Sequence, residues 1–468
     1  MKLKPLAVLL GLLSFAGSAY AATTLEYLFT DGYPLAVSAD GNAIAGNNPS
    51  NYGPFRWTRS GGRVDLGMAS APITGGSAGI PGISANGLRV ASTIVGPDST
   101  YSTQGLWTQG SGWQFLMPPM PPGGHVQDKD MGSIWGLSGD GLTAVGLFWS
   151  PGRGHACSWT QATGAVDLGS LASNLATRAN GVNFNGSVIV GWAESPTFGY
   201  RTPAAWVNGQ LTALAPDIIG EAQCVTQDGQ VAGGFQRDDA SNLRQACFWR
   251  RTGNSWGPVE LLGYVPGSTP GYALNVVEGI SADASLAVGY CSFSGDPYNT
   301  TGFVWTPEDG VVDVVQFLAN AGILPDPSFS ITSLTCMTPD GTKLVGYGHD
   351  TLGPGTTRAF MIHLDRTAAV RPSAAVASSL QLAASPNPVR TGTTFSFDLP
   401  RAAPASLTVQ DASGRTVRRV VSATLEAGHH QFAWDGRDDA GSSLPSGMYF
   451  SHLVAGNEHV SRKLVLFH

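Results

Sequence analysis

Apolar and polar residues alternate along most of this chain in short runs that end at turn-forming residues. The clearest example is residues 37–46 (VSADGNAIAG), in which an Asp-Gly pair separates two short β-forming runs. The same pattern returns at residues 83–87, 137–141, 182–186, 225–229, 280–284 and 337–341. The seven copies follow one another at a mean spacing of about 50 residues, and an internal repeat of this length indicates a repeat architecture.

Two further landmarks recur within the copies. An apolar run ends in a tryptophan in six copies and in Ile362 in the seventh; the tryptophans are Trp57, Trp107, Trp159, Trp206, Trp249 and Trp305. A Val-Asp-Leu-Gly segment follows at residues 64–67 and 166–169, with looser versions at 113–117, 211–214, 259–263 and 311–315. Since Asp-Gly and Asn-Gly pairs favour hairpin turns, each copy predicts four short strands. The chain therefore predicts a seven-bladed β-propeller.

The seventh copy lacks a fourth strand of its own, because its repeat ends after the apolar run at residues 360–364. Residues 25–29 (LEYLF) precede the first copy and have a strand-forming pattern. We expect this first segment to pair with the last blade, which closes the ring and removes two exposed sheet edges.

A different pattern begins after the repeats. Residues 366–379 are rich in Ala, Ser and Pro and predict a linker. Residues 380–468 then contain short alternating runs, which predict a small Ig-like β-sandwich with strands at 395–399, 406–410, 416–421, 430–434, 448–454 and 460–467. The expected fold class is therefore all-β: a propeller over residues 22–365 followed by a sandwich.

Composition agrees with this fold class and excludes others. Only 13% of the residues are charged, against roughly 25% in an average soluble chain. A hydrophobic content of 42% is too high for a disordered chain, and 61 glycines with 30 prolines favour frequent turns over long helices. The formal net charge is -7, which argues against a nucleic-acid-binding protein because such proteins carry an excess of basic residues.

The first 21 residues predict an export signal. Lys2 and Lys4 precede an apolar stretch at residues 6–16, and Ala19-Tyr20-Ala21 supplies a small-x-small cleavage pattern. The apolar stretch is too short for a membrane-spanning helix, and no transmembrane segment is predicted elsewhere. We expect an extracellular protein or one on the outer-membrane surface of a bacterium.

Five cysteines lie in the expected exported part: Cys157, Cys224, Cys247, Cys291 and Cys336. An oxidising compartment permits disulfides, although an odd number leaves at least one thiol unpaired. Four of the five occupy repeat positions that other copies fill with small or apolar residues. We therefore expect buried free thiols that behave as small hydrophobic side chains.

The sequence predicts no catalytic residue, metal site or cofactor. Residues 75–79 (GGSAG) match the Gly-x-Ser-x-Gly formula, but they lie in a glycine-rich loop rather than in the strand-to-helix turn that a nucleophile elbow needs. The nine histidines show no His-x-x-x-His spacing and the cysteines no Cys-x-x-Cys spacing. The aspartates of the repeated turns could bind calcium, but their recurrence favours a role in the turns themselves.

One face of the propeller is the expected place for a ligand. The turns between first and second strands are short, whereas the loops between second and third strands and those between blades are long and share one face. The candidate binding residues there are Trp149, Trp192, Tyr200, Tyr298, His125 and Asp128. Exposed aromatic residues beside carboxylates suit recognition of a sugar or a protein surface, but they could instead pack on their own blades.

The motifs resemble two known families. The Ser-x-Asp-Gly, x-Ala-Phe-x-Trp and Asp-Leu-Gly cycle over roughly residues 30–364 resembles bacterial extracellular HAF repeats, named for a His-Ala-Phe tripeptide; the corresponding residues here are 155–157 (HAC), 245–247 (QAC) and 358–360 (RAF). That resemblance implies secretion and a propeller-like array. Residues 385–388, 411–415, 434–438, 445–449 and 462–465 resemble the Ig-like domain of flagellar hook-capping proteins and the sorting domain of type IX secretion clients. Either the type IX machinery or the cell surface is then an implied partner.

Two functions are compatible with these observations. The first is a non-catalytic binding protein, displayed or released through its C-terminal domain, with a glycan or protein ligand on the propeller. The alternative is an extracellular polysaccharide hydrolase or lyase on the same scaffold. Paired carboxylates near the central channel favour the enzyme, but the sequence alone does not identify such a pair.

Overall fold

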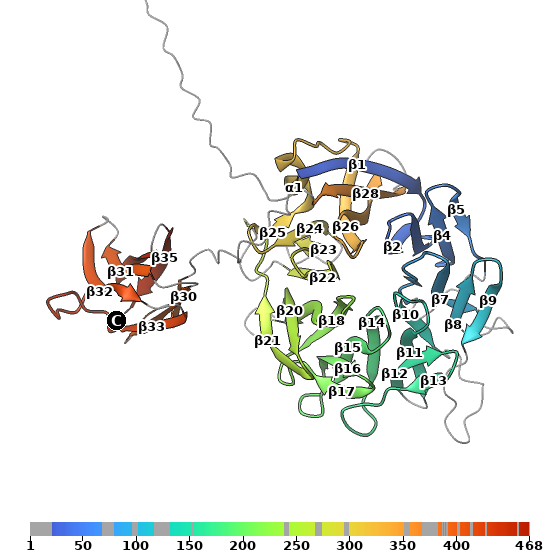
Figure 1. The fold of residues 1–468 in the computed structure, drawn as a ribbon, viewed down its shortest axis with the longest axis horizontal. Helices are drawn as coiled ribbons and strands as arrows, with labels where there is room; N and C mark the ends of the chain where they lie inside the picture. The colour runs from blue at the N-terminus through green and yellow to red at the C-terminus, as the bar shows by residue number, and fades with distance from the viewer. Residues whose placement is uncertain are drawn as a thin grey trace, which may run out of the picture. The chain divides into compact units, whose positions relative to one another are not determined.

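The computed structural model forms two compact units, which are described separately (Figure 1). The first comprises residues Met1–Ala369 and the second Val370–His468. The description covers residues 21–67, 79–95, 102–116, 132–150, 153–237, 243–266, 274–293, 299–350, 356–366, 382–385, 387, 389, 392–399, 403–411, 415–425, 428–455 and 458–467. The expected signal peptide lies outside these residues except for its last residue, Ala21.

Seven four-stranded sheets make up the described part of the first unit and follow one another around a ring (Figure 1). Blade 1 contains β2 (Tyr33–Val37), β3 (Ala43–Asn47), β4 (Pro54–Thr58) and β5 (Gly62–Asp65). Blade 2 contains β6 (Gly82–Ile83), β7 (Arg89–Val95), β8 (Ser102–Thr108) and β9 (Gly112–Leu116). Blade 3 contains β10 (Ser133–Leu137), β11 (Ala144–Ser150), β12 (Arg153–Thr160) and β13 (Gly164–Asp167). Blade 4 contains β14 (Thr177–Val182), β15 (Val188–Glu194), β16 (Arg201–Val207) and β17 (Gln210–Ala213).

The remaining blades complete the ring. Blade 5 contains β18 (Gly220–Val225), β19 (Val231–Arg237), β20 (Arg244–Thr252) and β21 (Ser255–Leu261). Blade 6 contains β22 (Leu274–Ile280), β23 (Ala287–Ser292), β24 (Thr301–Thr306) and β25 (Gly310–Asp313). Blade 7 takes β26 (Phe329–Met337), β27 (Lys343–Asp350) and β28 (Thr357–Asp365) from the C-terminal end of the unit and β1 (Ala21–Thr30) from its N-terminal end.

Strand β1 pairs antiparallel with β28, so the segment expected to complete the seventh blade occupies that place. Tyr27 packs edge-on against Phe329 at 5.2 Å between ring centroids, and Phe29 packs in the same way against Phe55 of blade 1. The first strands of successive blades contact one another all the way round, including β26 with β2. The blades therefore form a closed circle whose innermost strands face a central channel.

The repeated turn owes its shape to a small hydrogen-bond network. In the first copy, the Ser38 hydroxyl donates to Asp40 Oδ1 at 2.6 Å and accepts from the Ala43 N–H at 2.9 Å. Gly41 adopts a φ of 68°, a conformation that favours glycine. Equivalent bonds form at Ser138 and its Asp140. These aspartates thus hold the turn, which explains their recurrence in the sequence.

Neighbouring turns are also bonded to each other on one face of the ring, which we call the turn face. Backbone N–H groups donate to the next turn at five blade boundaries: Ala39 to Ala85, Ala85 to Gly139, Asp140 to Phe184, Phe184 to Gln227 and Ala282 to Pro339. The Lys343 ammonium donates to the Asp40 carbonyl and links the last blade to the first. The longer loops lie on the opposite face, which we call the loop face.

The repeated tryptophans serve mainly as core anchors. Trp206 and Trp249 are fully buried, and Ile362 replaces them in blade 7 with no exposed surface. The Trp206 indole N–H donates to the Leu168 carbonyl of the preceding blade at 2.9 Å. This bond joins the tryptophan landmark of blade 4 to the Asp-Leu-Gly landmark of blade 3.

All five cysteines are free thiols, as the sequence predicts. Cys157, Cys247 and Cys291 are buried, whereas Cys224 and Cys336 are half-buried. Burial raises the pKa of Cys157 to about 12 and that of Cys291 to about 12, which keeps these thiols protonated and unreactive.

One expected strand is shorter than predicted. Strand β25 ends at Asp313, because this residue caps helix α1 (Val314–Asn320) by accepting from the N–H groups of Val315 and Gln316. Val314, Phe317 and Leu318 bury the helix against the core of blades 6 and 7. The apolar run that predicted a strand at 311–315 is therefore divided between a strand and a helix.

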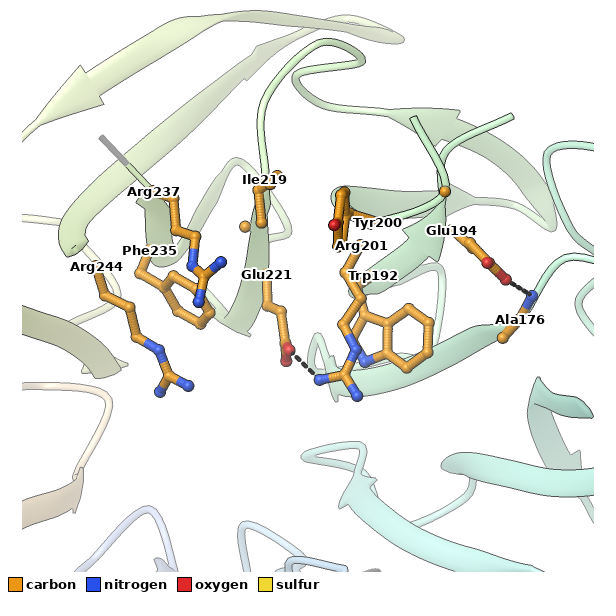
Figure 2. A pocket seen from close by; sticks show the side chains of 12 residues that line it. Ala176, Trp192, Glu194, Tyr200, Arg201, Ile219, Glu221, Phe235, Arg237 and Arg244 are labelled. Atoms are coloured by element: carbon orange, nitrogen blue, oxygen red, sulfur yellow. Dashed lines mark hydrogen bonds and ion pairs between the residues drawn. The ribbon is translucent and has the colours of Figure 1, made fainter. Parts of the chain in front are cut away.

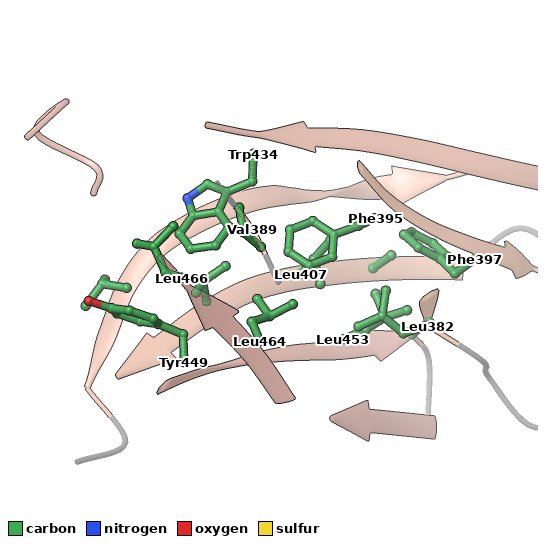
Figure 3. Close-up of a cluster of buried hydrophobic side chains, with 14 of the residues drawn as sticks. Leu382, Val389, Phe395, Phe397, Leu407, Trp434, Tyr449, Leu453, Leu464 and Leu466 are labelled. Carbon is green, nitrogen blue, oxygen red and sulfur yellow. The ribbon is translucent and has the colours of Figure 1, made fainter. Parts of the chain in front are cut away.

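The second unit is a sandwich of a three-stranded and a four-stranded antiparallel sheet. The smaller sheet has the order β29 (Ala383–Ser385), β30 (Thr393–Leu399) and β33 (Gly428–Trp434). The larger has the order β32 (Thr416–Leu425), β31 (Ala403–Asp411), β34 (Gly447–Ala455) and β35 (Glu458–Leu466). Phe395 stacks on Trp434, and Tyr449 packs edge-on against the same indole in the buried core between the sheets (Figure 3).

The expected linker lies outside the described residues except for its first residue. Arg366 pairs with Asp283 of blade 6 at 2.7 Å, so this residue belongs to the packed propeller. Among the described residues, no helix is both long and apolar enough to cross a membrane.

Candidate functional site

Three of the six predicted binding residues lie among the described residues. Trp192 and Tyr200 line the same pocket on the loop face. Trp149 and Trp192 lie in strands β11 and β15 rather than in loops, because the second strands of these blades extend past the position expected for the loop. Tyr298, His125 and Asp128 lie outside the described residues.

The pocket lies between blades 4 and 5 and has a volume of about 400 Å³ (Figure 2). Its walls come from the ends of β15 and β19, the beginnings of β16 and β20, and the start of β18. Its side chains are aromatic and charged: Trp192, Glu194, Tyr200, Arg201, Glu221, Phe235, Arg237 and Arg244. Three arginines thus converge on one pocket in a chain that has 33 acidic and only 26 basic residues.

Two of these arginines lie directly opposite each other. Arg237 ends β19, and Arg244 begins β20 as its partner in the antiparallel register. Like charges in this arrangement repel each other. Among the described residues, neither guanidinium has a carboxylate within ion-pair distance; Arg244 donates to the Tyr290 hydroxyl at 3.2 Å and lies 4.8 Å from the centroid of the Phe235 ring. The pair therefore presents positive charge that no described carboxylate neutralises.

The opposite wall of the pocket is neutralised only in part. The Glu221 carboxylate accepts from Arg201 and from Arg178, each at 2.7 Å, and it is only 8% exposed. Burial lowers the pKa of Arg178 to about 10, so it remains charged at neutral pH. Two guanidiniums therefore contact one carboxylate here, while Glu194, the other lining carboxylate of this wall, pairs with Arg153.

Aromatic side chains complete the pocket. Trp192 is 8% exposed, and its ring lies 4.4 Å from the Arg201 guanidinium carbon. The Trp192 indole N–H is buried and has no hydrogen-bond partner. Tyr200 is 61% exposed and stacks on Phe198 at 6.4 Å. The pocket therefore offers an accessible aromatic ring, that of Tyr200, beside its cationic groups.

The same arrangement occurs in two consecutive blades. Arg201 and Arg244 each stand five residues before the repeated tryptophan. Trp192 and Phe235 each follow the glycine of the second strand, and in each blade the arginine lies over that aromatic ring. The sequence-based prediction of the site did not include the two arginines. Their equivalent positions in copies 4 and 5 are the sequence signal that could have identified them.

A further carboxyl group lies in the wall of the central channel. Glu278 is half-buried in β22, where a β-bulge interrupts its pairing with β23. Among the described residues, no side chain lies within hydrogen-bond or ion-pair distance of its carboxyl group. Desolvation, with a contribution from the negative charge of Glu221, raises the pKa of Glu278 to about 8. Glu221 and Glu278 thus lie on β18 and β22, the neighbouring first strands of blades 5 and 6.

A second pocket on the loop face has a different character. It lies between blades 6 and 7, has a volume of about 440 Å³, and is lined by Phe293, Val315, Phe329 and neutral polar residues. The described residues that line it include no charged side chain. Among the described residues, no group of three or more His, Cys, Asp or Glu side chains could hold a metal ion.

Comparison with known proteins identifies the C-terminal unit. Residues 386–458 match the family described as the FlgD Ig-like domain. The basal-body rod modification proteins FlgD of Salmonella typhimurium and Salmonella typhi are each 36% identical to this chain over 70 residues, which are 15% of this chain and 30% of each relative. The chain therefore spans about three tenths of the length of the curated relatives it matches. The second unit is thus an Ig-like domain.

Several solved propellers are similar to this chain. An oligogalacturonate lyase in complex with manganese has a TM-score of 0.46 and 10% identity, over 76% of this chain and 96% of that one. The β-propeller domain of the Trilobed protease from Pyrococcus furiosus has a TM-score of 0.46 and 8% identity, over 72% and 97%. TolB from Acinetobacter baumannii has a TM-score of 0.37 and 8% identity, over 72% and 65%. These likenesses concern the fold alone and include both enzymes and non-enzymes.

Proposed function

We propose that this protein is a surface-associated binding protein whose propeller captures an anionic ligand in the pocket between blades 4 and 5. The observation that carries the proposal is the convergence of Arg201, Arg237 and Arg244 on this pocket, with Arg237 directly opposite Arg244. A ligand carboxylate or sulfate that bridges the two guanidiniums removes their repulsion and gains charge-assisted hydrogen bonds.

The neighbouring groups support a sugar as the carrier of that charge. The exposed Tyr200 ring offers a stacking surface beside the cationic groups of the pocket. A carboxylated or sulfated saccharide supplies a ring face, hydroxyl acceptors and an anion together. An acidic glycan is therefore the ligand class that we propose.

Calorimetric titration with defined glycans tests this function. We expect polygalacturonate, alginate or a sulfated glycan to bind, and a neutral glucan not to bind. Replacing Arg237 and Arg244 by alanine should weaken binding by about tenfold or more, since each charged hydrogen bond contributes roughly 1.5–3 kcal/mol. The melting temperature of the ligand-free variant should not fall, because the substitution also relieves repulsion.

Arg250→Ala is the matched control, because Arg250 lies on the same strand but pairs with Glu260 away from the pocket. Equal binding of neutral and acidic glycans, or an undiminished affinity in the double variant, would contradict the proposal. The same incubations are examined for depolymerisation. Turnover would favour the alternative, a polysaccharide hydrolase or lyase that uses the Glu221 and Glu278 carboxyls.

We also propose that the C-terminal Ig-like domain directs secretion or attachment of the exported propeller. Its match to a domain of flagellar rod modification proteins supports a role in assembly at the cell surface. Its motifs further resemble those of type IX sorting domains, and the repeats resemble secreted HAF arrays. The expected location is the cell exterior or the outer-membrane surface.

A reporter fusion tests the proposed role of the domain. Residues 380–468, which include a separate buried core, are joined to an exported fluorescent protein in a host that has the type IX machinery. We expect the reporter to appear outside the cell or on its surface. A reporter that stays in the periplasm, as the unfused reporter does, contradicts a sorting role.

A further inference from the structure

The position of Glu278 connects the central channel to the anion pocket. It lies on β22, the first strand of blade 6, and β22 contacts β18, the first strand of blade 5, which carries Glu221. The residue is half-buried, and desolvation of its carboxyl group favours the neutral form. The positive charges of Arg244, which lines the pocket, and of Arg178 attract the Glu278 carboxylate.

Charged and titratable groups from four blades surround this carboxyl. They are Arg178 of blade 4, Glu221, Cys224 and Arg244 of blade 5, Tyr290 of blade 6, and Cys336 and Tyr347 of blade 7. Burial raises the pKa of Tyr290, Tyr347 and Cys336 to about 12 each and also raises the pKa of Cys224. The Glu221 carboxyl group accepts from Arg178 and Arg201 at 2.7 Å each.

Glu278 is therefore the member of this group whose charge changes between about pH 6 and about pH 9. In the ionised form, its negative charge repels an anion in the adjacent pocket and attracts Arg244 away from that anion. In the protonated form, both effects disappear. The charge of one channel residue thus determines how strongly the pocket attracts an anion.

We propose that Glu278 is a proton-binding site coupled to the anion pocket, so that the protein takes up a proton when it binds its acidic ligand. This inference rests on the proposed function. Coupling between the two sites is reciprocal: the bound anion favours the protonated carboxyl, and the protonated carboxyl favours the bound anion. Affinity for the anion is therefore high in neutral or mildly acidic surroundings and falls in alkaline ones.

Sulfate is the probe for this coupling, because its charge is the same throughout the pH range used. Its apparent affinity is obtained from the rise of the thermal midpoint with sulfate concentration, at constant ionic strength, near about pH 6.5 and about pH 9. For the wild-type protein we expect the affinity to fall by about fivefold or more between the two. Glu278→Gln should keep the higher affinity at both pH values, whereas Glu308→Gln, an exposed control in the same blade, should behave as wild type.

Each outcome decides a separate question. Equal sulfate affinity at the two pH values overturns the coupling but leaves the anion site standing. A wild-type pH dependence in Glu278→Gln assigns the proton to another group and also overturns the inference. No sulfate effect at the lower pH, or an effect unchanged by replacing Arg237 and Arg244, overturns the anion site and the coupling with it. Calorimetry of the wild type in two buffers of different ionisation enthalpy measures the proton uptake directly.

Discussion

Glu278→Gln is expected to stabilise the propeller by on the order of 3 kcal/mol near pH 8 and to change its stability little near pH 4.5. Desolvation in the channel wall raises the pKa of Glu278 from 4.5 to about 8. Below the lower value the carboxyl is protonated in both the folded and the unfolded chain. As the pH rises towards about 8, only the unfolded chain ionises freely, so the wild type loses stability over this interval and glutamine does not.

Urea unfolding of the two proteins at a series of pH values measures this difference. The full shift corresponds to about 5 kcal/mol, and the access of the channel lumen to the carboxyl reduces that figure. Glu308→Gln controls for the loss of a carboxylate from an exposed position. Parallel stability curves for wild type and Glu278→Gln would show that Glu278 ionises as it does in water.

Removal of strand β1 is expected to have the largest effect on the fold. A chain without residues 22–30 leaves β28 as an exposed edge and loses the contacts of Tyr27 with Phe329 and of Phe29 with Phe55. It also loses the pairs that Glu26 forms with Arg59 and His363 at 2.9 Å each. We expect the melting temperature of the propeller to fall by about 10 °C or more, since the loss is several kcal/mol.

Differential scanning calorimetry of the shortened chain gives the answer, with a chain that lacks only residues 1–21 as the control. A synthetic peptide of residues 21–30 should restore part of the lost stability by pairing with the vacant edge. An unchanged melting temperature would mean that the ring does not depend on this closure.

The propeller could be predicted because its signals are local and repeated. Each Asp-Gly turn specifies a hairpin within a few residues, and the register of seven copies follows from the spacing. Helix α1 escaped prediction because its run of valines favours a strand, and only the capping carboxylate of Asp313 starts a helix there. Strand β29 has three residues, Ala-Ala-Ser, and carries no strand signal of its own.

The pocket was harder to predict because its residues are distant in the sequence. Arg178 and Glu221 are 43 residues apart and meet only because consecutive blades lie side by side. The opposition of Arg237 and Arg244 depends on the exact register of β19 and β20. The raised pKa of Glu278 depends on groups from several blades. The aromatic candidates Trp192 and Tyr200 indicated the position of the pocket. The charged residues that determine its chemistry come together only when the blades pack into the ring.

The hydrogen bonds between successive turns have a mechanical consequence. They link blades 1 to 5 in order, and blade 6 to blade 7, along the turn face. A blade that tilts therefore rotates about its bonded end. Such tilting changes the spacing between blades least at the bonded turn face and most at the far side. On that far side, Glu221 of blade 5 pairs with Arg178 and Arg201 of blade 4, so these ion pairs restrain the width of the pocket that contains Arg237 and Arg244.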